Sequence, residues 1–283
     1  MFFKTSKKLV MMAMLIVILL AIGVTALVDR NRQVASNYRQ TRIPTLFFHG
    51  WGSSYHAEQH MVSAIRRTHA TNGVIRAEVS KTGKVTLVGR LPKKAVNPIV
   101  MVNYQNSREP NYRVTAKWVL NVLQRLQATY HFKEFNTVSH SAGNEAVLYY
   151  LADDAPNHPE LPRLNREINL AAHFAGIRGY DAVKHNTVNA QGKPRHMIAT
   201  YQALLKLRKT YPRQAAVLNI YGNIGDHSDG VVQNYSSKSL RYLVANRAAS
   251  YQELEIKGKR AQHSKLHTNA TVDHAIVKFL WQK

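Results

Sequence analysis

Residues 135–143 read FNTVSHSAG, an apolar strand-like run that leads straight into a turn of small residues. The segment that follows, residues 143–152, has helical character. A serine on a sharp turn between a strand and a helix is typical of a nucleophile elbow, here with Ser139 in place of the usual first glycine. Small neighbours suit so tight a turn, and the helix N-terminus favours negative charge near Ser141. In the competing interpretation, Ser139 or Ser141 only caps the helix.

A nucleophile elbow needs backbone N–H groups that stabilise a developing oxyanion. Residues 46–52 read LFFHGWG and end the first strand-like run of the body. An H-G-x-G loop in this place supplies such donors, and we expect them to be the N–H groups of Trp51 and Ala142. His49 is interpreted as a structural residue rather than a base. In the competing interpretation, Gly50 and Gly52 only make a turn.

The acid and the base of a triad are expected after the nucleophile, in that order. Residues 225–232 read GDHSDGVV and follow an apolar run at 217–222. Asp229 is the first choice for the carboxylate that orients the base, because it lies where a loop re-enters regular structure. Asp226 is the second choice, since it could equally bond its own backbone in a turn.

The base is expected in residues 263–268, which read HSKLHT and lie between a predicted strand and the last predicted helix. His263 is the first choice and His267 is the rival. His274 falls inside the last helix and is expected to face solvent. An ordinary histidine has a pKa near 6.5 and must be neutral to act as a base, so activity is expected to fall below about pH 6.

Strand-like and helix-like segments alternate along the body of the chain, which predicts a mostly parallel sheet with helices on both faces. Residues 73–79 and 83–89 read as a hairpin. The other expected strands are 44–48, 98–104, 135–140, 167–172, 216–221 and 251–257, and the expected helices are 56–69, 110–130, 143–152, 198–209 and 271–281. Residues 176–197 have little periodicity and are expected over the strand ends, where ligands bind. Whether they form a lid is left open.

The chain begins with a segment that has the features of a membrane anchor. Residues 9–28 are a run of twenty uncharged residues, preceded by three lysines. Twenty helical residues span about 30 Å, the thickness of the hydrocarbon core, and the lysines favour a cytoplasmic N-terminus. We interpret residues 1–33 as cytoplasmic residues plus a signal anchor, 34–43 as a linker and 44–283 as an extracytoplasmic domain. A cleaved signal, which would make the protein secreted, is the alternative.

The chain of 283 residues has 39 basic and 16 acidic residues and a net charge of +23. Five of the basic residues and one acidic residue lie in residues 1–33, which leaves 34 basic and 15 acidic residues, or +19, for the body. This charge favours anionic partners such as lipid headgroups or a cell-wall polymer. A location outside the membrane argues against nucleic acid.

The residue types present also limit the chemistry. Zero cysteines exclude a disulfide scaffold and a cysteine nucleophile or ligand. His56 and His60 are four residues apart and could share a helix face, but no third ligand accompanies them. We therefore expect neither a metal site nor a cofactor.

These landmarks resemble the α/β-hydrolase superfamily, and more closely the cell-surface α/β hydrolases of unknown function from Gram-positive bacteria. The resemblance covers about residues 44–282 and implies an α/β-hydrolase fold and a hydrolytic activity without naming the substrate. In small secreted bacterial lipases, which are similar, the catalytic histidine begins an H-x-x-L segment, which supports His263 together with Asp229. The sequence departs from the family pattern at Ser139 and at Asn144, where a glycine is common.

The sequence therefore predicts an esterase-like or lipase-like serine hydrolase with a triad of Ser141, His263 and Asp229. The expected substrate is a small-molecule, lipid or polymer ester, cleaved through an acyl-enzyme. The alternative is a non-catalytic envelope protein that uses the same fold to bind an anionic polymer or lipid. The oligomeric state and the two parts of the ester cannot be read from the sequence.

Overall fold

The computed structural model describes residues 10–21 and 37–283. Residues 10–21 form a helix whose large apolar side chains are exposed, as Met11 is to 70%. No helix within the described residues is both long and apolar enough to cross a membrane. The anchor expected at residues 9–28 lies partly outside the described residues and stays a prediction.

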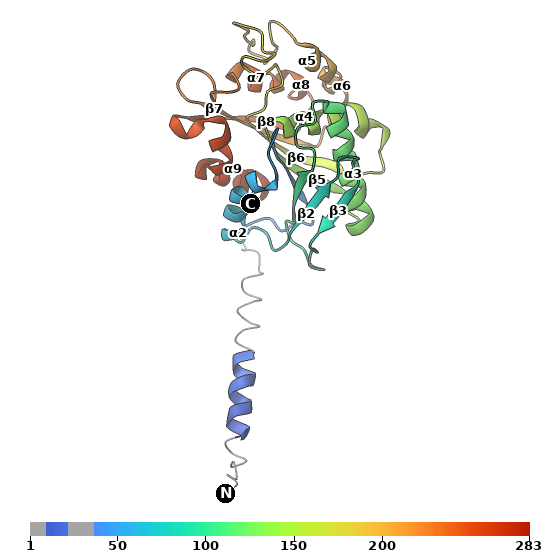
Figure 1. Ribbon diagram of the computed structural model, residues 1–283, viewed down its shortest axis with the longest axis vertical. Helices are drawn as coiled ribbons and strands as arrows, with labels where there is room; N and C mark the ends of the chain where they lie inside the picture. The colour runs from blue at the N-terminus through green and yellow to red at the C-terminus, as the bar shows by residue number, and fades with distance from the viewer. Residues whose placement is uncertain (1–9, 22–36) are drawn as a thin grey trace.

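The body is built around one eight-stranded sheet with the order β3-β2-β4-β1-β5-β6-β7-β8 (Figure 1). Every neighbouring pair is parallel except β2 and β3, which form the expected antiparallel hairpin. The mostly parallel sheet is therefore confirmed. The strands are β1 Thr45–Phe48, β2 Val74–Val79, β3 Val85–Val88, β4 Ile99–Tyr104, β5 Glu134–His140, β6 Arg163–Leu170, β7 Ala216–Asn223 and β8 Ser250–Lys257.

Helices cover both faces of the sheet. Side chains alternate between the faces along each strand, so apolar side chains on each face pack against the helices that cover it. In β1, Leu46 and Phe48 join the apolar cluster on the face of α3 and α4, whereas Phe47 joins the cluster on the face of α2 and α9. The helices are α2 Gln59–Arg67, α3 Tyr112–Tyr130, α4 Ala142–Tyr149, α5 Ala199–Leu204, α6 Leu207–Thr210, α7 Asn234–Lys238, α8 Leu240–Val244 and α9 Ala270–Trp281.

The structure differs from the predicted elements in two places. The single helix expected at 198–209 is two short helices, α5 and α6, with a break at Leu205–Lys206. Helices α7 and α8 between β7 and β8 were not predicted at all. In α7 the buried serines bond to backbone carbonyls, as Ser237 Oγ does to Ala172 O at 2.6 Å, so this helix lacks an apolar stripe. Helix α8 is only five residues long.

The parallel strands bring distant loops to one edge of the sheet. Phe48 of β1 lies opposite Ser139 of β5, so the loop after β1 begins beside the turn after β5. Strands β7 and β8 run in the same direction and end at the same edge. The segments that carry the predicted site therefore meet at the carboxyl end of the sheet, as is usual for this class of fold.

Glu58, just before α2, is buried to 99% and neither of its carboxyl oxygens has a hydrogen-bond partner among the described residues. Burial raises the pKa of this carboxyl well above its ordinary value of 4.5. The folded chain therefore keeps a proton that the unfolded chain loses. The stabilising contribution of Glu58 to the free energy of unfolding is full below about pH 4.5. It declines as the pH rises toward the folded pKa of this carboxyl.

We therefore expect Glu58→Gln, which cannot ionise, to stabilise the protein increasingly as the pH rises. Each pH unit between the two pKa values corresponds to about 1.4 kcal/mol, so the gain in unfolding free energy should be clearly larger at pH 8 than at pH 5. Urea unfolding at both pH values measures it. Glu160→Gln, at a carboxyl exposed to 60%, is the control and should show no such growth. Equal gains at both pH values would contradict the assignment.

Candidate active site

The turn between β5 and α4 holds Ser141 in a strained backbone conformation. Its φ of 50° and ψ of −125° lie in a region that residues other than glycine rarely adopt. The Ser141 N–H donates to Leu170 O at 2.9 Å, and the side-chain amide of Asn144 donates to Ser141 O at 2.8 Å and to Leu170 O at 3.0 Å. Asn144, a departure from the family pattern, therefore fixes the turn.

The turn packs tightly against the loop after β1. A Cβ on Gly143 would lie 2.6 Å from Phe48 O, closer than real Cβ contacts. A Cβ on Gly50 would lie 3.0 Å from Ser141 Cβ. Only glycine allows these close backbone approaches, so the H-G-x-G loop and the elbow are held together.

The structure brings the three first-choice residues into one chain of contacts. Ser141 Oγ lies 3.0 Å from His263 Nε2, and His263 Nδ1 lies 2.7 Å from Asp229 Oδ2. Ser141 and His263 are 9% and 8% exposed, and Asp229 is 1% exposed. With the imidazole neutral and its proton on Nδ1, Nε2 is free to accept the serine proton.

Asp229 is itself fixed by the backbone. Its second oxygen, Oδ1, accepts from the N–H groups of Val231 at 2.9 Å and Val232 at 2.7 Å. The His263 N–H donates to Asp229 O at 2.9 Å, which ties the main chains of these two residues together. Oδ2 is therefore left to the imidazole.

His140 packs against His263. Its ring packs 4.8 Å from that of His263, and its Nε2 lies 3.1 Å from His263 O. Burial lowers the pKa of His140 well below 6.5, and the neighbouring His263 adds to the effect. His140 is therefore neutral, and with its proton on Nε2 it donates to the His263 carbonyl. Sequence reasoning did not find this role.

The second-choice residues, Asp226 and His267, make no hydrogen bond to Ser141 or His263 among the described residues. Asp226 is an exposed carboxylate that pairs with Arg178 at 2.8 Å and accepts from Ser228 Oγ at 2.6 Å. His267 packs its ring 5.2 Å from His140 and has no contact with Ser141 among the described residues. Burial, followed by the nearby His263, lowers the pKa of His267.

His49 fixes the loop after β1 through hydrogen bonds to the backbone, as expected of a structural residue. Its Nε2 accepts from the Tyr104 N–H at 3.1 Å, so Nδ1 carries the proton that reaches Gly50 O at 2.9 Å. Burial lowers the pKa of His49, which keeps the ring neutral. The backbone N–H groups of Trp51 and Ala142 have no acceptor among residues 37–283 and remain available to a ligand.

A second buried histidine–carboxylate pair lies one helical turn beyond Ser141. The sequence did not predict it. His173 Nδ1 lies 2.9 Å from Glu145 Oε1, and both side chains are at most 5% exposed. Burial alone would lower the pKa of His173, but the Glu145 carboxylate outweighs it and the pKa is raised. The ring of Tyr112 lies 6.2 Å from that of His173.

The segment 176–197 packs on the helices that follow β7 and on the Asp229 loop. The Arg178 N–H donates to Val231 O at 3.1 Å, and the Tyr235 hydroxyl donates to Val183 O at 3.2 Å. A Cβ on Gly192 would lie 2.7 Å from Arg241 Cβ. The segment therefore supports the loop that carries Asp229.

His56 and His60, the pair considered as metal ligands, contact other side chains. His56 Nδ1 contacts Gln59 at 2.8 Å, and His60 Nε2 contacts Asp273 at 3.1 Å. In the part of the chain that the structure describes, no three histidine or carboxylate side chains are grouped as a metal site requires. His274 is exposed, as expected.

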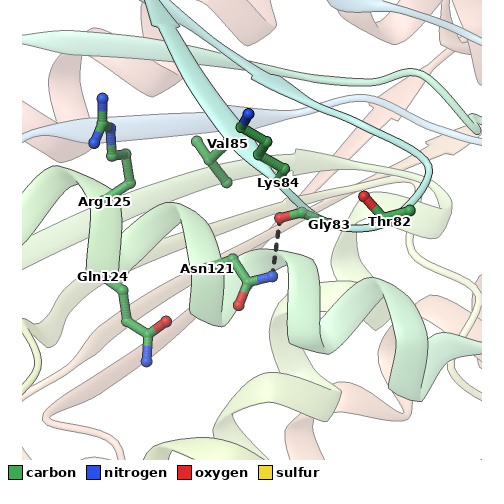
Figure 2. A pocket seen from close by; sticks show the side chains of 7 residues that line it. All are labelled: Thr82, Gly83, Lys84, Val85, Asn121, Gln124 and Arg125. Carbon is green, nitrogen blue, oxygen red and sulfur yellow. Dashed lines mark hydrogen bonds between the residues drawn. The ribbon is translucent and has the colours of Figure 1, made fainter.

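A hollow of about 520 Å³ lies away from these residues, between the β2–β3 turn and α3 (Figure 2). Asn121 Nδ2 donates to Gly83 O at 2.9 Å across it, and Lys84 and Arg125 lie on its rim. None of Ser141, Asp229 and His263 lines this hollow. It is a cationic surface feature, separate from the candidate active site.

Replacing Ser141 by glycine is expected to stabilise the fold relative to replacing it by alanine. Both variants lack the hydroxyl, but only alanine keeps the Cβ that makes a φ of 50° unfavourable. Strain of this kind costs about 1–3 kcal/mol, so Ser141→Gly should be more stable than Ser141→Ala by about 1 kcal/mol or more. Chemical denaturation measures the difference. An alanine variant as stable as the glycine variant would show that the turn is not strained.

Comparison with known proteins agrees with this fold. A gene product of Listeria innocua has the same fold, with a TM-score of 0.74 and 22% identity over 85% of this chain and 94% of its own. A Lactobacillus plantarum protein, described as a candidate cell surface hydrolase, has a TM-score of 0.68 and 19% identity over 85% of this chain and 90% of its own. No protein of curated function matches the sequence.

The sequence of residues 32–283 matches a family described as alpha/beta hydrolases of unknown function (DUF915). The match spans the whole sheet, all the covering helices and the candidate site. The chain therefore belongs to this family of α/β hydrolases.

Proposed function

We propose that this protein is a serine hydrolase that cleaves carboxylic esters through an acyl-enzyme. The observation that carries the proposal is the continuous chain of contacts from Ser141 through His263 to Asp229, mounted on a strained turn. A serine, a neutral histidine and a buried carboxylate in this order form the constellation that activates a hydroxyl for attack on a carbonyl.

In the proposed reaction, His263 Nε2 takes the proton of Ser141 as Oγ attacks the ester carbonyl. Asp229 holds the imidazole in the required tautomer and stabilises the imidazolium that forms. The N–H groups of Trp51 and Ala142 bind the oxyanion, and each such donor is worth about 3 kcal/mol of barrier. His263 then gives its proton to the leaving alcohol, and water hydrolyses the acyl-Ser141 ester.

Ester substrates are proposed rather than amides because an alcohol is a better leaving group than an amine. The oxygen of an alcohol leaves once it receives one proton, and His263 supplies that proton.

The proposed location is outside the cell membrane, with an N-terminal anchor or a cleaved signal. Residues 9–28 are uncharged and follow three lysines, and a structure with the same fold is described as a candidate cell surface hydrolase. Protease treatment of intact cells that express the full chain tests the location. Digestion of the body without cell lysis is expected, and a body protected until lysis would contradict it.

The alternative function is non-catalytic binding of an anionic polymer. It draws on the charge of the body and on the hollow of Figure 2, where Lys84 and Arg125 have no ion-pair partner within residues 37–283. Such a protein needs no activated serine, so reactivity of Ser141 separates the two functions.

Fluorophosphonate labelling of the full chain and of Ser141→Ala tests the proposed function. A fluorophosphonate reacts with a serine only when a base and an oxyanion site activate it. We expect the wild-type protein to be labelled and Ser141→Ala to remain unlabelled. A folded wild-type protein that takes up no label would overturn the proposal and favour the polymer-binding alternative.

A further inference from the structure

A small cavity lies directly beside the proposed oxyanion site. It has a volume of about 20 Å³, and its lining includes Gly50, Trp51 and Ala142 together with Tyr112 and Ala146. A carbonyl oxygen bound by the N–H groups of Trp51 and Ala142 would therefore place one substituent of its carbon into this cavity.

The substituent in the cavity is the acyl group rather than the alcohol. The leaving oxygen must take its proton from His263 Nε2, but neither His263 nor Asp229 lines the cavity. The alcohol therefore leaves on the side of the imidazole, and the acyl group points the other way.

The size of the cavity limits the acyl group. With a volume of about 20 Å³, the cavity is small and favours a short acyl group. Its walls are firmly packed. The ring of Tyr104 lies 5.2 Å from the rings of both His49 and Trp118, and Thr115 Oγ1 donates to Tyr112 O at 3.0 Å.

The lining also opposes a negatively charged acyl group. Glu109 lines the cavity, and its carboxylate accepts from Asn106 Nδ2 and from the Asn111 N–H, both at 3.1 Å. A fixed carboxylate near an acyl carboxylate is unfavourable.

We propose that the enzyme is specific for short, uncharged acyl groups and removes acetyl groups from alcohols. This inference rests on the proposed function and adds the acyl part of the substrate. Ser141 Oγ bonds to the acetyl carbon, and the alcohol leaves with the proton from His263. Water then cleaves acetyl-Ser141, which releases acetate and regenerates the hydroxyl.

The test is a chain-length series of p-nitrophenyl acetate, butyrate and hexanoate with the full chain. Each step in chain length is expected to lower kcat/KM by about tenfold or more, since a poorly accommodated methylene typically changes specificity by 10- to 200-fold. Equal or higher kcat/KM for hexanoate would overturn the acyl inference and leave the proposed function standing. If no ester is turned over and no fluorophosphonate is bound, both proposals fail.

A matched pair of variants at the cavity wall provides the second test. Tyr112→Ala removes a ring that lines the cavity and should raise the butyrate-to-acetate ratio about tenfold, whereas Tyr112→Phe keeps the ring and should leave the ratio unchanged. Circular dichroism checks that each variant folds. An unchanged ratio in a folded Tyr112→Ala protein would show that the acyl group binds elsewhere.

Discussion

Replacing His263 by alanine is expected to lower kcat for ester hydrolysis by about 10⁵- to 10⁶-fold. The imidazole Nε2 lies 3.0 Å from Ser141 Oγ and is the proposed acceptor of its proton. Without it, the hydroxyl must lose its proton to water, and the leaving alcohol has no acid. Steady-state assays with p-nitrophenyl acetate measure the loss, and fluorophosphonate labelling should disappear as well.

His267→Ala is the matched control, because it removes a histidine four residues along the same segment. His267 packs on His140 rather than on Ser141, so its loss should change kcat less than tenfold. If instead His267→Ala abolished activity while His263→Ala kept it, the base would have been assigned to the wrong histidine.

Asp229→Asn is expected to lower kcat by about 10⁴-fold with little change in the fold. The asparagine carbonyl can keep the bonds that Oδ1 accepts from Val231 and Val232. Its amide then faces His263 Nδ1 and donates to it, which forces the proton onto Nε2 and removes the base. Measurement of kcat together with thermal unfolding separates this effect from misfolding.

Asp226→Asn serves as the control for the acid. This carboxylate is 44% exposed and pairs with Arg178 rather than with a histidine. Its replacement should alter kcat only a few-fold. A comparable loss in both variants would indicate that the whole loop, and not Asp229 alone, determines activity.

The sequence predicted the features that depend on local pattern and chain order. The apolar run before Ser141 and the helical segment after it predicted the turn. The alternation of strand-like and helix-like segments predicted the sheet. The positions of Asp229 and His263 came from the expected order of acid and base together with the family resemblance. The structure places His263 against Ser141 and Asp229 against His263.

Other features could not be predicted because they depend on contacts between distant residues. The serines of α7 are buried through bonds to carbonyls sixty or more residues away, so they read as a polar loop. Nothing local shows that His140 would support His263, 123 residues later. The Glu145–His173 pair likewise forms only when β5, α4 and β6 are assembled.

The separation of 122 residues between Ser141 and His263 has a consequence for biosynthesis. A ribosome releases the N-terminal part first, so the nucleophile emerges long before its base. Strand β8, which precedes His263, joins the sheet at its edge beside β7. Under the proposed mechanism, the serine therefore stays unreactive until the last part of the chain has docked, and a nascent polypeptide is expected not to hydrolyse esters.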